Sequence, residues 1–393
     1  MLCRRFVSPA LLLFVSLALP AHAEKNLARP PGTTRYAPML AQLRALLAYD
    51  KAEGAGRMVL SSLGKSVKGR DLWMVTLHET PPVSASGSAP DADVPALDNT
   101  PAVPPASSPL PAAPPKRLFY LCRQHGHEPA STEAALEFIT QLVKAAPDSP
   151  LAMDLQRVTV YVVPMANPDG AEAFLRHNAH DKDINRDWLR RTQLETQSLY
   201  RAIVRLRPDM MTDQHELYPD DTRPDFTETA GGGSGASPAL VQTCDSAQSV
   251  VQIAMQAAGC PTVRHLVTDH HPARLAHRFG CIVAQVPTIL FETNRLTRLH
   301  RGVPARAQAH LQFMLALLRD TAGERATLLA EAATRSGAQG RDLSLLASRH
   351  LAAPRSSPAR PSPRQTAPVP STPPPPELGA GGPLAPPPAK DAE

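Results

Sequence analysis

His125, Glu128 and His215 have the residue types and the spacing of a catalytic metal site. His125 and Glu128 flank the dipeptide Gly126-His127, and the glycine permits a turn that brings both side chains to one ion. A catalytic zinc takes three protein ligands and keeps one position open. His215, in the segment TDQHE, is the expected third ligand. The sequence therefore predicts one zinc ion held by two histidines and a carboxylate.

His127 competes with His125 for the first ligand position. Neighbouring side chains in a strand or an extended turn point in opposite directions, so His127 and Glu128 would be aimed apart. We therefore favour His125 as the ligand.

These residues must be positioned by an alternation of strands and helices. Strands are expected at 58–63, 71–77, 117–122, 158–165, 209–212 and 286–291, and helices at 36–49, 133–145, 190–206, 239–258 and 300–333. The Gly- and Thr-rich residues 220–238 are expected to form a loop over the pocket. This order is typical of an α/β sheet with helices on both faces. Ligands of such sheets collect beyond the carboxyl ends of the strands, where every motif lies.

The ordered set of motifs resembles the zinc carboxypeptidase family, the carboxypeptidase A/B-like peptidases. The resemblance covers residues 36–319 without the Pro-rich insertion, and it implies a mixed, mostly parallel sheet in one catalytic domain. Its elements are His125-Gly-His-Glu128, the turn Asn167-Pro168-Asp169-Gly170, Arg176, Asn185-Arg186, His215 and Glu292-Thr293, with Gly64-Lys65-Ser66 and Gly69-Arg70 upstream.

The resemblance implies a role for each of these residues. Asn185 and Arg186 would bind the free carboxylate at the C-terminus of a peptide, and Arg176 would stabilise the oxyanion. Glu292 would be the general base that takes a proton from a zinc-activated water. Asp183 would hold the ring of His125. Taken singly, these residues also fit a surface ion pair, a turn or the end of a strand.

The sequence departs from the family at one position. The family usually has a tyrosine on a mobile loop about twenty residues before the general base, and this chain has His270 and His271 there instead. Either one of the two histidines contacts the substrate, or the segment is a solvated polar turn.

The catalytic domain is expected at 28–333. Three segments differ from it in composition. Residues 1–23 contain Arg4 and Arg5, a short apolar run and a small-x-small site, which is typical of a cleaved signal peptide. Residues 81–115 and 354–393 concentrate the 43 prolines and are expected to be disordered. The protein is therefore expected to be periplasmic or secreted.

The net charge of +5 is modest and no Lys/Arg block is present, which argues against nucleic-acid binding. Beyond the leader, no segment is apolar enough to span a membrane.

Four cysteines follow the leader: Cys122, Cys244, Cys260 and Cys281. They allow three disulfide connectivities. A helix over 239–258 would hold Cys244 and Cys260 about 24 Å apart at ~1.5 Å per residue, which argues against that pair. Buried free thiols are the alternative to a bridge.

Three functions compete. The favoured one is a metallocarboxypeptidase that acts on peptides with a free C-terminal carboxylate, cell-wall peptides among them. The second is a zinc deacylase or amidohydrolase that acts on acylated amino acids. The third is a binding module without catalytic activity, against which the complete set of ligands and Glu292 argues.

Overall fold

The structure is a computed structural model that describes residues 28–78, 114–267, 273–295 and 302–335. The expected leader and the Pro-rich tail lie outside these ranges, as do His270 and His271 and nearly all of the Pro-rich insertion. Within the described part of the chain, no helix is long and apolar enough to cross a bilayer.

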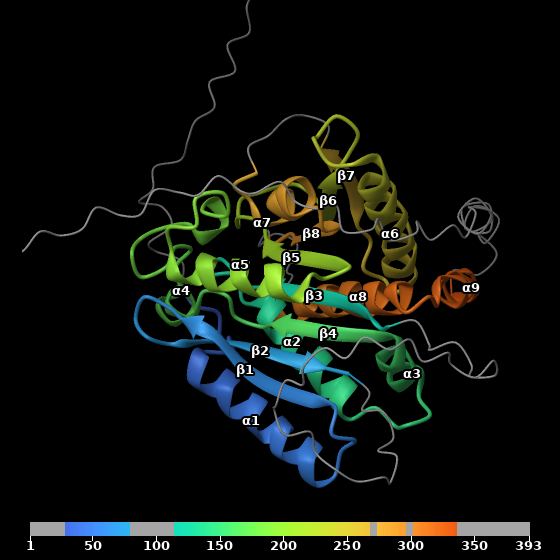
Figure 1. Cartoon of the computed structure of the whole chain (residues 1–393), viewed down its shortest axis with the longest axis horizontal. Helices are drawn as coiled ribbons and strands as arrows, with labels where there is room; N and C mark the ends of the chain where they lie inside the picture. Colours follow the sequence, from blue (N-terminus) through green and yellow to red (C-terminus); the bar gives the residue numbers. More distant parts are fainter. Residues whose placement is uncertain (1–27, 79–113, 268–272, 296–301, 336–393) are drawn as a thin grey trace, which may run out of the picture. The chain divides into compact units, whose positions relative to one another are not determined.

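Eight strands in the described residues form one sheet, in the order β1-β2-β4-β3-β5-β8-β6-β7 (Figure 1). Strands β3, β4, β5 and β8 run parallel to their neighbours in this group, and so do β6 and β7. The hairpin β1–β2 is antiparallel, as are the pairs β2–β4 and β6–β8. The strands are β1 (Met58–Lys65), β2 (Asp71–Leu77), β3 (Lys116–Cys122), β4 (Val158–Val163), β5 (Met210–Glu216), β6 (Phe226–Ala230), β7 (Val263–Val267) and β8 (Thr288–Thr293).

Helices cover both faces of this sheet, as expected. One core packs β3, β4 and β8 against α1, α2, α6, α8 and α9, and the other packs the opposite side of β3 against α5 and α7. The helical segments are α1 (Tyr36–Ala52), α2 (Ala130–Val143), α3 (Pro150–Arg157), α4 (Pro168–Ala173), η2 (Ile184–Arg186), α5 (Leu194–Leu206), α6 (Pro238–Ala257), α7 (Ala276–Phe279), η3 (Gly280–Ala284), α8 (Val303–Thr321) and α9 (Arg325–Arg335).

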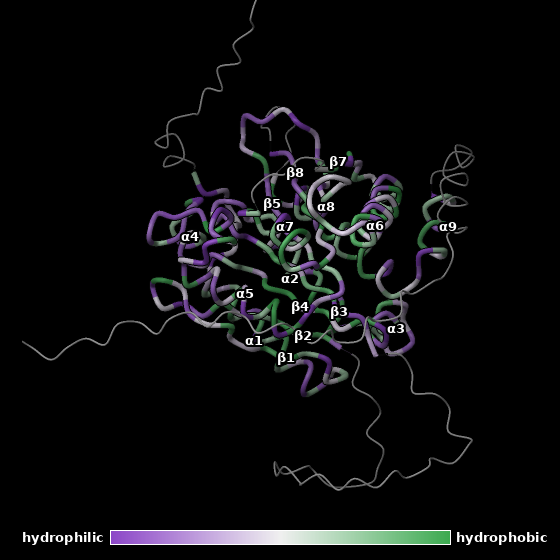
Figure 2. Tube along the Cα trace, turned by 45° about the horizontal axis from the view of Figure 1, so that its top comes forward, coloured by the Kyte–Doolittle hydropathy of each residue, from purple (hydrophilic) through white to green (hydrophobic). Residues whose placement is uncertain are grey.

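Strand β3 shows how the sequence forms this core. Its residues from Leu118 to Cys122 are all fully buried, as in a strand with helices on both sides. Tyr120 faces the first core, where its ring contacts Phe138 and its hydroxyl donates a hydrogen bond to the carbonyl of Met314 at 2.7 Å. Phe119 and Leu121 face the second core. Figure 2 shows the same pattern, with hydrophobic residues gathered through α2, β3 and β4 and hydrophilic ones in the connecting loops.

The structure differs from the expected elements mainly in the polar segments. Residues 226–230 form the strand β6, so the loop predicted over 220–238 is wrong there. The sequence FTETA lacks an apolar run, but Thr227 and Thr229 are fully buried. Strand β5 continues through Glu216, beyond the expected end at residue 212. Helix α3 and strand β7 were not predicted. Asn167 caps α4, so the expected turn begins a helix.

Candidate active site

The turn that carries His125 is fixed by buried contacts on both sides. Arg123 has a left-handed backbone (φ 55°), and its guanidinium donates to the carbonyls of Gly126 and Thr34 at 3.0 and 2.8 Å. Gly126 lies directly against α4, where a Cβ atom added to it would come within 1.9 Å of the carbonyl carbon of Gly170. Only a glycine fits at this contact.

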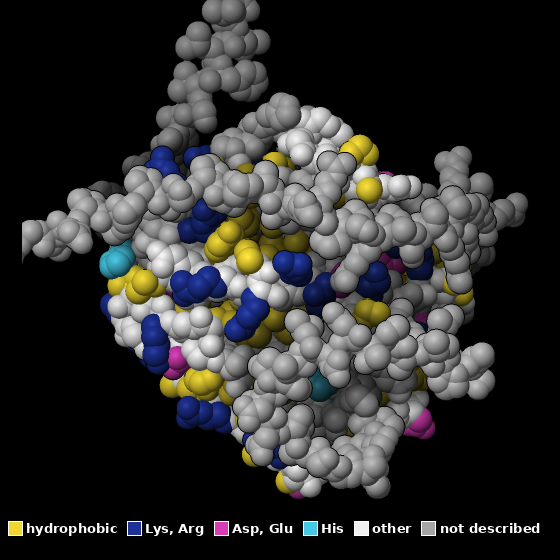
Figure 3. All heavy atoms as spheres, viewed as in Figure 1, with side chains coloured by type: hydrophobic (Ala, Val, Ile, Leu, Met, Phe, Trp, Pro, Cys, Tyr) yellow, Lys and Arg dark blue, Asp and Glu magenta, His cyan; other side chains and the backbone are white. Residues whose placement is uncertain are grey.

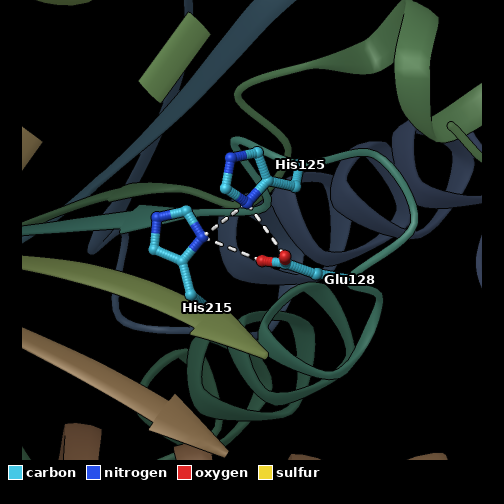
Figure 4. Close-up of side chains that lie close together, drawn as sticks. All are labelled: His125, Glu128 and His215. Atoms are coloured by element: carbon cyan, nitrogen blue, oxygen red, sulfur yellow. Dashed lines mark hydrogen bonds and ion pairs between the residues drawn. The ribbon is translucent and has the colours of Figure 1, made fainter. Parts of the chain in front are cut away.

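His125, Glu128 and His215 converge at the end of β3 and β5 (Figure 4). Their ligand atoms lie within 4.8 Å of one another, and all three side chains are buried. The Nδ1 atom of His125 lies 2.9 Å from one carboxylate oxygen of Glu128, and the Nδ1 atom of His215 lies 2.8 Å from the other. The two Nδ1 atoms are 3.0 Å apart.

Each histidine of this cluster has a carboxylate at its other ring nitrogen. Asp183 lies 3.1 Å from Nε2 of His125, and Asp213 lies 2.8 Å from Nε2 of His215. A carboxylate accepts the proton of Nε2, which leaves Nδ1 as the atom that faces the cluster. Two ring nitrogens and a carboxylate that face one another form a set of donors able to bind a metal cation. The residues present therefore fit zinc, which binds two histidines and a glutamate in hydrolytic sites.

The charges of these buried groups depend on one another. Burial would raise the pKa of Glu128, but His125 and His215 hold it well below its usual range. Burial would lower the pKa of His215, but Asp213 and Glu128 hold it well above the usual value. The pKa of Asp183 is likewise well below its usual range, because His125 and Arg176 outweigh burial. The site thus keeps its carboxylates ionised.

His127, the competing ligand, lies outside this cluster. It is fully buried, its Nε2 atom is 3.4 Å from the guanidinium of Arg295, and burial lowers its pKa to about 2. The neutral ring packs edge-on against that of His125, with centroids 6.3 Å apart.

The structure brings the arginines and the asparagine of the sequence prediction to the same site. Arg176 donates to Asp183 at 2.9 Å, and its Nη1 atom lies 3.2 Å from Nδ1 of His125. Asn185 is buried, with its side-chain nitrogen 2.9 Å from Nε2 of His215 and its oxygen accepting from the backbone of Ala276. The side chain of Arg186 is 42% exposed and contacts Asp183 only at 3.9 Å.

Glu292 lies on β8 directly opposite His215 on β5 in the strand register. Its side chain is partly buried and lines the same pocket as the metal cluster. Burial raises the pKa of Glu292 to about 7, and the positive charge of His215 opposes that rise. Glu292 is thus a carboxylate that can exchange a proton near neutral pH.

A pocket of about 210 Å³ contains these groups. His125 and Glu128 of the metal cluster line it, together with residues of β6, of the loop before β6 and of α7. Its lining consists of His125, Glu128, Arg176, Asn185, Arg186, Glu216, Leu217, Tyr218, Arg223, Phe226, Glu228, Leu275, His277, Leu290 and Glu292.

Sequence reasoning missed Asp213 and His277, which lie behind the ligand His215. Asp213 is fully buried, and its side chain also accepts from Gln124 at 2.6 Å. Its second oxygen faces His277, whose Nδ1 atom is 3.5 Å away and whose Nε2 atom lies 2.9 Å from Glu228. The pKa of His277 is raised, because these two carboxylates outweigh burial. Asp213 could have been found, since residues i and i+2 of a strand share a face.

Tyr218 was missed as well. Its ring lies under the guanidinium of Arg176, with the centroid 5.3 Å from the Cζ atom, and it lines the pocket. A tyrosine therefore reaches this pocket from the segment after β5. The family resemblance had predicted one about twenty residues before Glu292.

Comparison with known proteins gives one consistent family. Residues 44–206 match the model of the zinc carboxypeptidase family. The chain is 30% identical over 122 residues to carboxypeptidase 2 of Trichophyton tonsurans, and 30% identical over 114 residues to a zinc carboxypeptidase of Saccharothrix mutabilis subsp. capreolus. These matches cover 31% and 29% of this chain and 20% of each relative, so the chain spans about a fifth of their length.

The fold is similar to those of solved metallocarboxypeptidases. The crystal structure of a metallo-carboxypeptidase from Burkholderia cenocepacia aligns with a TM-score of 0.53 at 19% identity, over 72% of this chain and 69% of that one. A metallo-carboxypeptidase from Pseudomonas aeruginosa, in complex with (2-guanidinoethylmercapto)succinic acid, also gives 0.53 at 19% identity, over 73% and 70%. The expected fold class is thereby confirmed.

Proposed function

We propose that this chain, whose residues 44–206 match the zinc carboxypeptidase family, hydrolyses the C-terminal peptide bond of peptides. The observation that carries the proposal is the meeting of three groups in one pocket. The metal cluster, the protonatable Glu292 and the half-exposed Arg186 all line it. Such a pocket combines the parts that hydrolysis next to a free carboxylate requires.

Arg186 is the residue best suited to bind the carboxylate of the substrate. Its guanidinium is a planar fork, matched to a carboxylate, and much of its side chain is open to the pocket. Asn185 lies beside it, but its amide is already bonded to His215 and Ala276. We therefore assign Arg186 the main part of carboxylate binding and Asn185 the support of His215.

His125, Glu128 and His215 would hold the zinc ion, and when bound it supplies Lewis-acid polarisation of the scissile carbonyl. Arg176 lies at the edge of the cluster, where it donates to the oxygen that becomes negatively charged. Glu292 takes a proton from the attacking water and then gives it to the leaving amine. Its pKa of about 7 suits both transfers.

The test is hydrolysis of a peptide library in which half of the members are C-terminally amidated. Stepwise loss of C-terminal residues from the free acids alone is the expected result. Glu292→Gln should retain zinc but lose turnover by about 10²-fold or more. The exposed Glu53→Gln is the matched control and should keep full activity. Hydrolysis of acylated amino acids but not of peptides would instead support a deacylase.

Arg186→Gln tests the carboxylate site separately. This variant should raise KM for free-acid peptides and leave zinc binding unchanged, because Arg186 lies outside the metal cluster. An unchanged preference for free acids over amides would contradict the assignment.

We also propose that the protein acts in the periplasm or outside the cell. The support is the basic start, the apolar run and the Ala21-His22-Ala23 site of the leader. Peptides from the cell wall carry free carboxylates and are therefore a candidate substrate class. Mass spectrometry of the exported protein should find Glu24 as its first residue, and recovery of the full-length chain in the cytoplasm would contradict the proposal.

A further inference from the structure

Two of the cysteines meet in a small apolar cluster behind the pocket. Cys244 on α6 and Cys281 in η3 are both fully buried, together with Leu240 and Ala230. Their sulfur atoms lie against the same carbonyl oxygen, that of Thr288 on β8, at 4.0 and 3.4 Å. The two thiols are also close enough for each to shift the pKa of the other.

The other two cysteines lie in different surroundings. Cys122 ends β3, where its sulfur accepts a hydrogen bond from Gln214 at 3.5 Å. Cys260 follows α6 and is partly buried against the large core. Among the possible pairs of these four cysteines, the geometry favours Cys244 with Cys281 and leaves Cys122 and Cys260 as free thiols.

The chemistry of the pair also suits oxidation. A thiolate is the nucleophile in thiol–disulfide exchange, so a thiolate on either cysteine, Cys281 for example, can begin the exchange. Because the cluster is closed to solvent in the folded chain, the exchange must take place while the chain folds.

We propose that Cys244 and Cys281 form a disulfide when the chain folds in an oxidising compartment. The Cys281 thiolate attacks an external disulfide, such as that of a thiol oxidoreductase or oxidised glutathione, and releases one thiol. The Cys244 sulfur, losing its proton, then displaces the second thiol from Cys281. The two cysteines lose two protons and two electrons, and the external disulfide is reduced to two thiols.

The disulfide would restrict the movement of the segment α7–η3, which contributes residues to the pocket. It links α6 to η3, which directly follows α7. Helix α7 carries His277 and Arg278, and both contact Glu228 in the pocket, at 2.9 and 3.2 Å. Closing the chain between residues 244 and 281 would also restrict the unfolded state. This inference rests on oxidising conditions and not on the proposed reaction.

The test is refolding of the reduced chain in a buffer of oxidised and reduced glutathione, followed by alkylation in denaturant and peptide mapping. Two alkylated thiols are expected, on Cys122 and Cys260, with peptides containing Cys244 and Cys281 joined and lighter by two hydrogen atoms. Four alkylated thiols, or a bridge that includes Cys122 or Cys260, would overturn the proposal.

Variants separate the bridge from a simple packing role. Adding dithiothreitol should lower the thermal midpoint of the wild type and of the control Cys260→Ser by on the order of 10 °C. The midpoint of Cys244→Ser should not respond to the reductant, and its remaining three thiols should all be alkylated. An equal response of Cys244→Ser and Cys260→Ser would also overturn the bridge. Circular dichroism verifies that each variant is folded.

Discussion

The two metal-binding histidines owe their orientation to the carboxylates behind them. Asp183 and Asp213 accept at Nε2 of His125 and His215, so that both Nδ1 atoms face the cluster. Asp213 is fully buried, so its charge needs hydrogen-bond partners or a compensating charge more than that of Asp183 does. Its charge is balanced on the far side by His277, which also faces Glu228 and can donate from both ring nitrogens. His277 therefore supports the ligand His215 from a distance, through Asp213.

A prediction at this scale concerns His277→Gln. Without the imidazole of His277, Asp213 loses a partner and orients the ring of His215 less firmly. The affinity of the protein for zinc should therefore fall by about tenfold or more. Competition with a chelator measures that affinity without any assay of turnover. The control is the exposed His265→Gln, which should bind zinc as the wild type does. An unchanged affinity in a folded His277→Gln protein would show that His277 has only a packing role.

The decrease of kcat/KM at low pH should follow the protonation of Glu292. A base must be ionised, so kcat/KM should fall as the pH decreases through the pKa of this carboxyl, which burial raises to about 7. Bound zinc adds a positive charge nearby and moves the midpoint lower, so we expect it between about pH 5 and pH 7. A rate profile that is flat across this range would contradict the role of Glu292 as the base.

At the scale of the elements, the sequence predicted the apolar strands well and the polar ones poorly. β3, β4 and β8 are buried apolar runs, and their positions were predicted to within a few residues. β5 continues into Asp213, Gln214 and His215, and β6 reads FTETA, so neither has the usual apolar pattern. Their polar side chains can be buried because they have hydrogen-bond partners, as Asp213 has in Gln124 and Thr229 has in the carbonyl of Thr288. Local sequence rules fail here because the segment is selected for function.

The same distinction applies to the site. The cluster of His125, Glu128 and His215 was predictable from ligand spacing and from the ends of the strands. The contact of His277 with Glu228 depends on how α7 packs beside β6, and no local pattern reports that packing. Tyr218 was overlooked for the same reason.

The turn between β3 and α2 gives a prediction at this scale. Gly126→Ala would place a Cβ atom within 1.9 Å of the backbone of Gly170, so the turn must move away from α4. Because His125 and Glu128 flank this residue, both the zinc affinity and the thermal midpoint should fall. Gly232→Ala is the matched control, since nothing lies within 4 Å of its added Cβ atom. Equal stability and zinc affinity of the two variants would contradict the account.

At the scale of the whole molecule, charge is spread rather than concentrated. On the face seen in Figure 3, Lys and Arg side chains lie mostly singly, between hydrophobic ones. The modest net charge of +5 agrees with this picture. We therefore expect the pH dependence of stability to come from individual buried groups, and not from repulsion across the surface.

Asp154 on α3 is such a group. It is 1% exposed, one of its oxygens has no hydrogen-bond partner among the described residues, and burial raises its pKa to about 6. A carboxyl whose pKa is higher in the folded chain than in the unfolded chain destabilises the fold as the pH rises through that value. Asp154→Asn should therefore raise the free energy of unfolding by about 1 kcal/mol near pH 7.5 and change it little near pH 4.

Urea denaturation at both values checks this prediction. The exposed Asp148→Asn serves as the control and should have little effect at either pH. A gain for Asp154→Asn that is equal at the two values would show that burial of the carboxylate is not its cause.

Strand β8 lies between the residues that bind the metal and a group of residues that line only the substrate pocket. Glu292 pairs across the sheet with His215 on one side and with Phe226 on the other. The metal ligands come from the β5 side, whereas Arg223, Phe226 and Glu228 line the pocket from the β6 side. Mutations of Arg223 and Phe226 can therefore alter which side chain the pocket accepts, whereas Glu228 must be kept because it contacts His277 behind the ligand His215. For directed evolution of a new preference, Arg223 and Phe226 are the natural positions to randomise, with β3, β5 and Glu228 left intact.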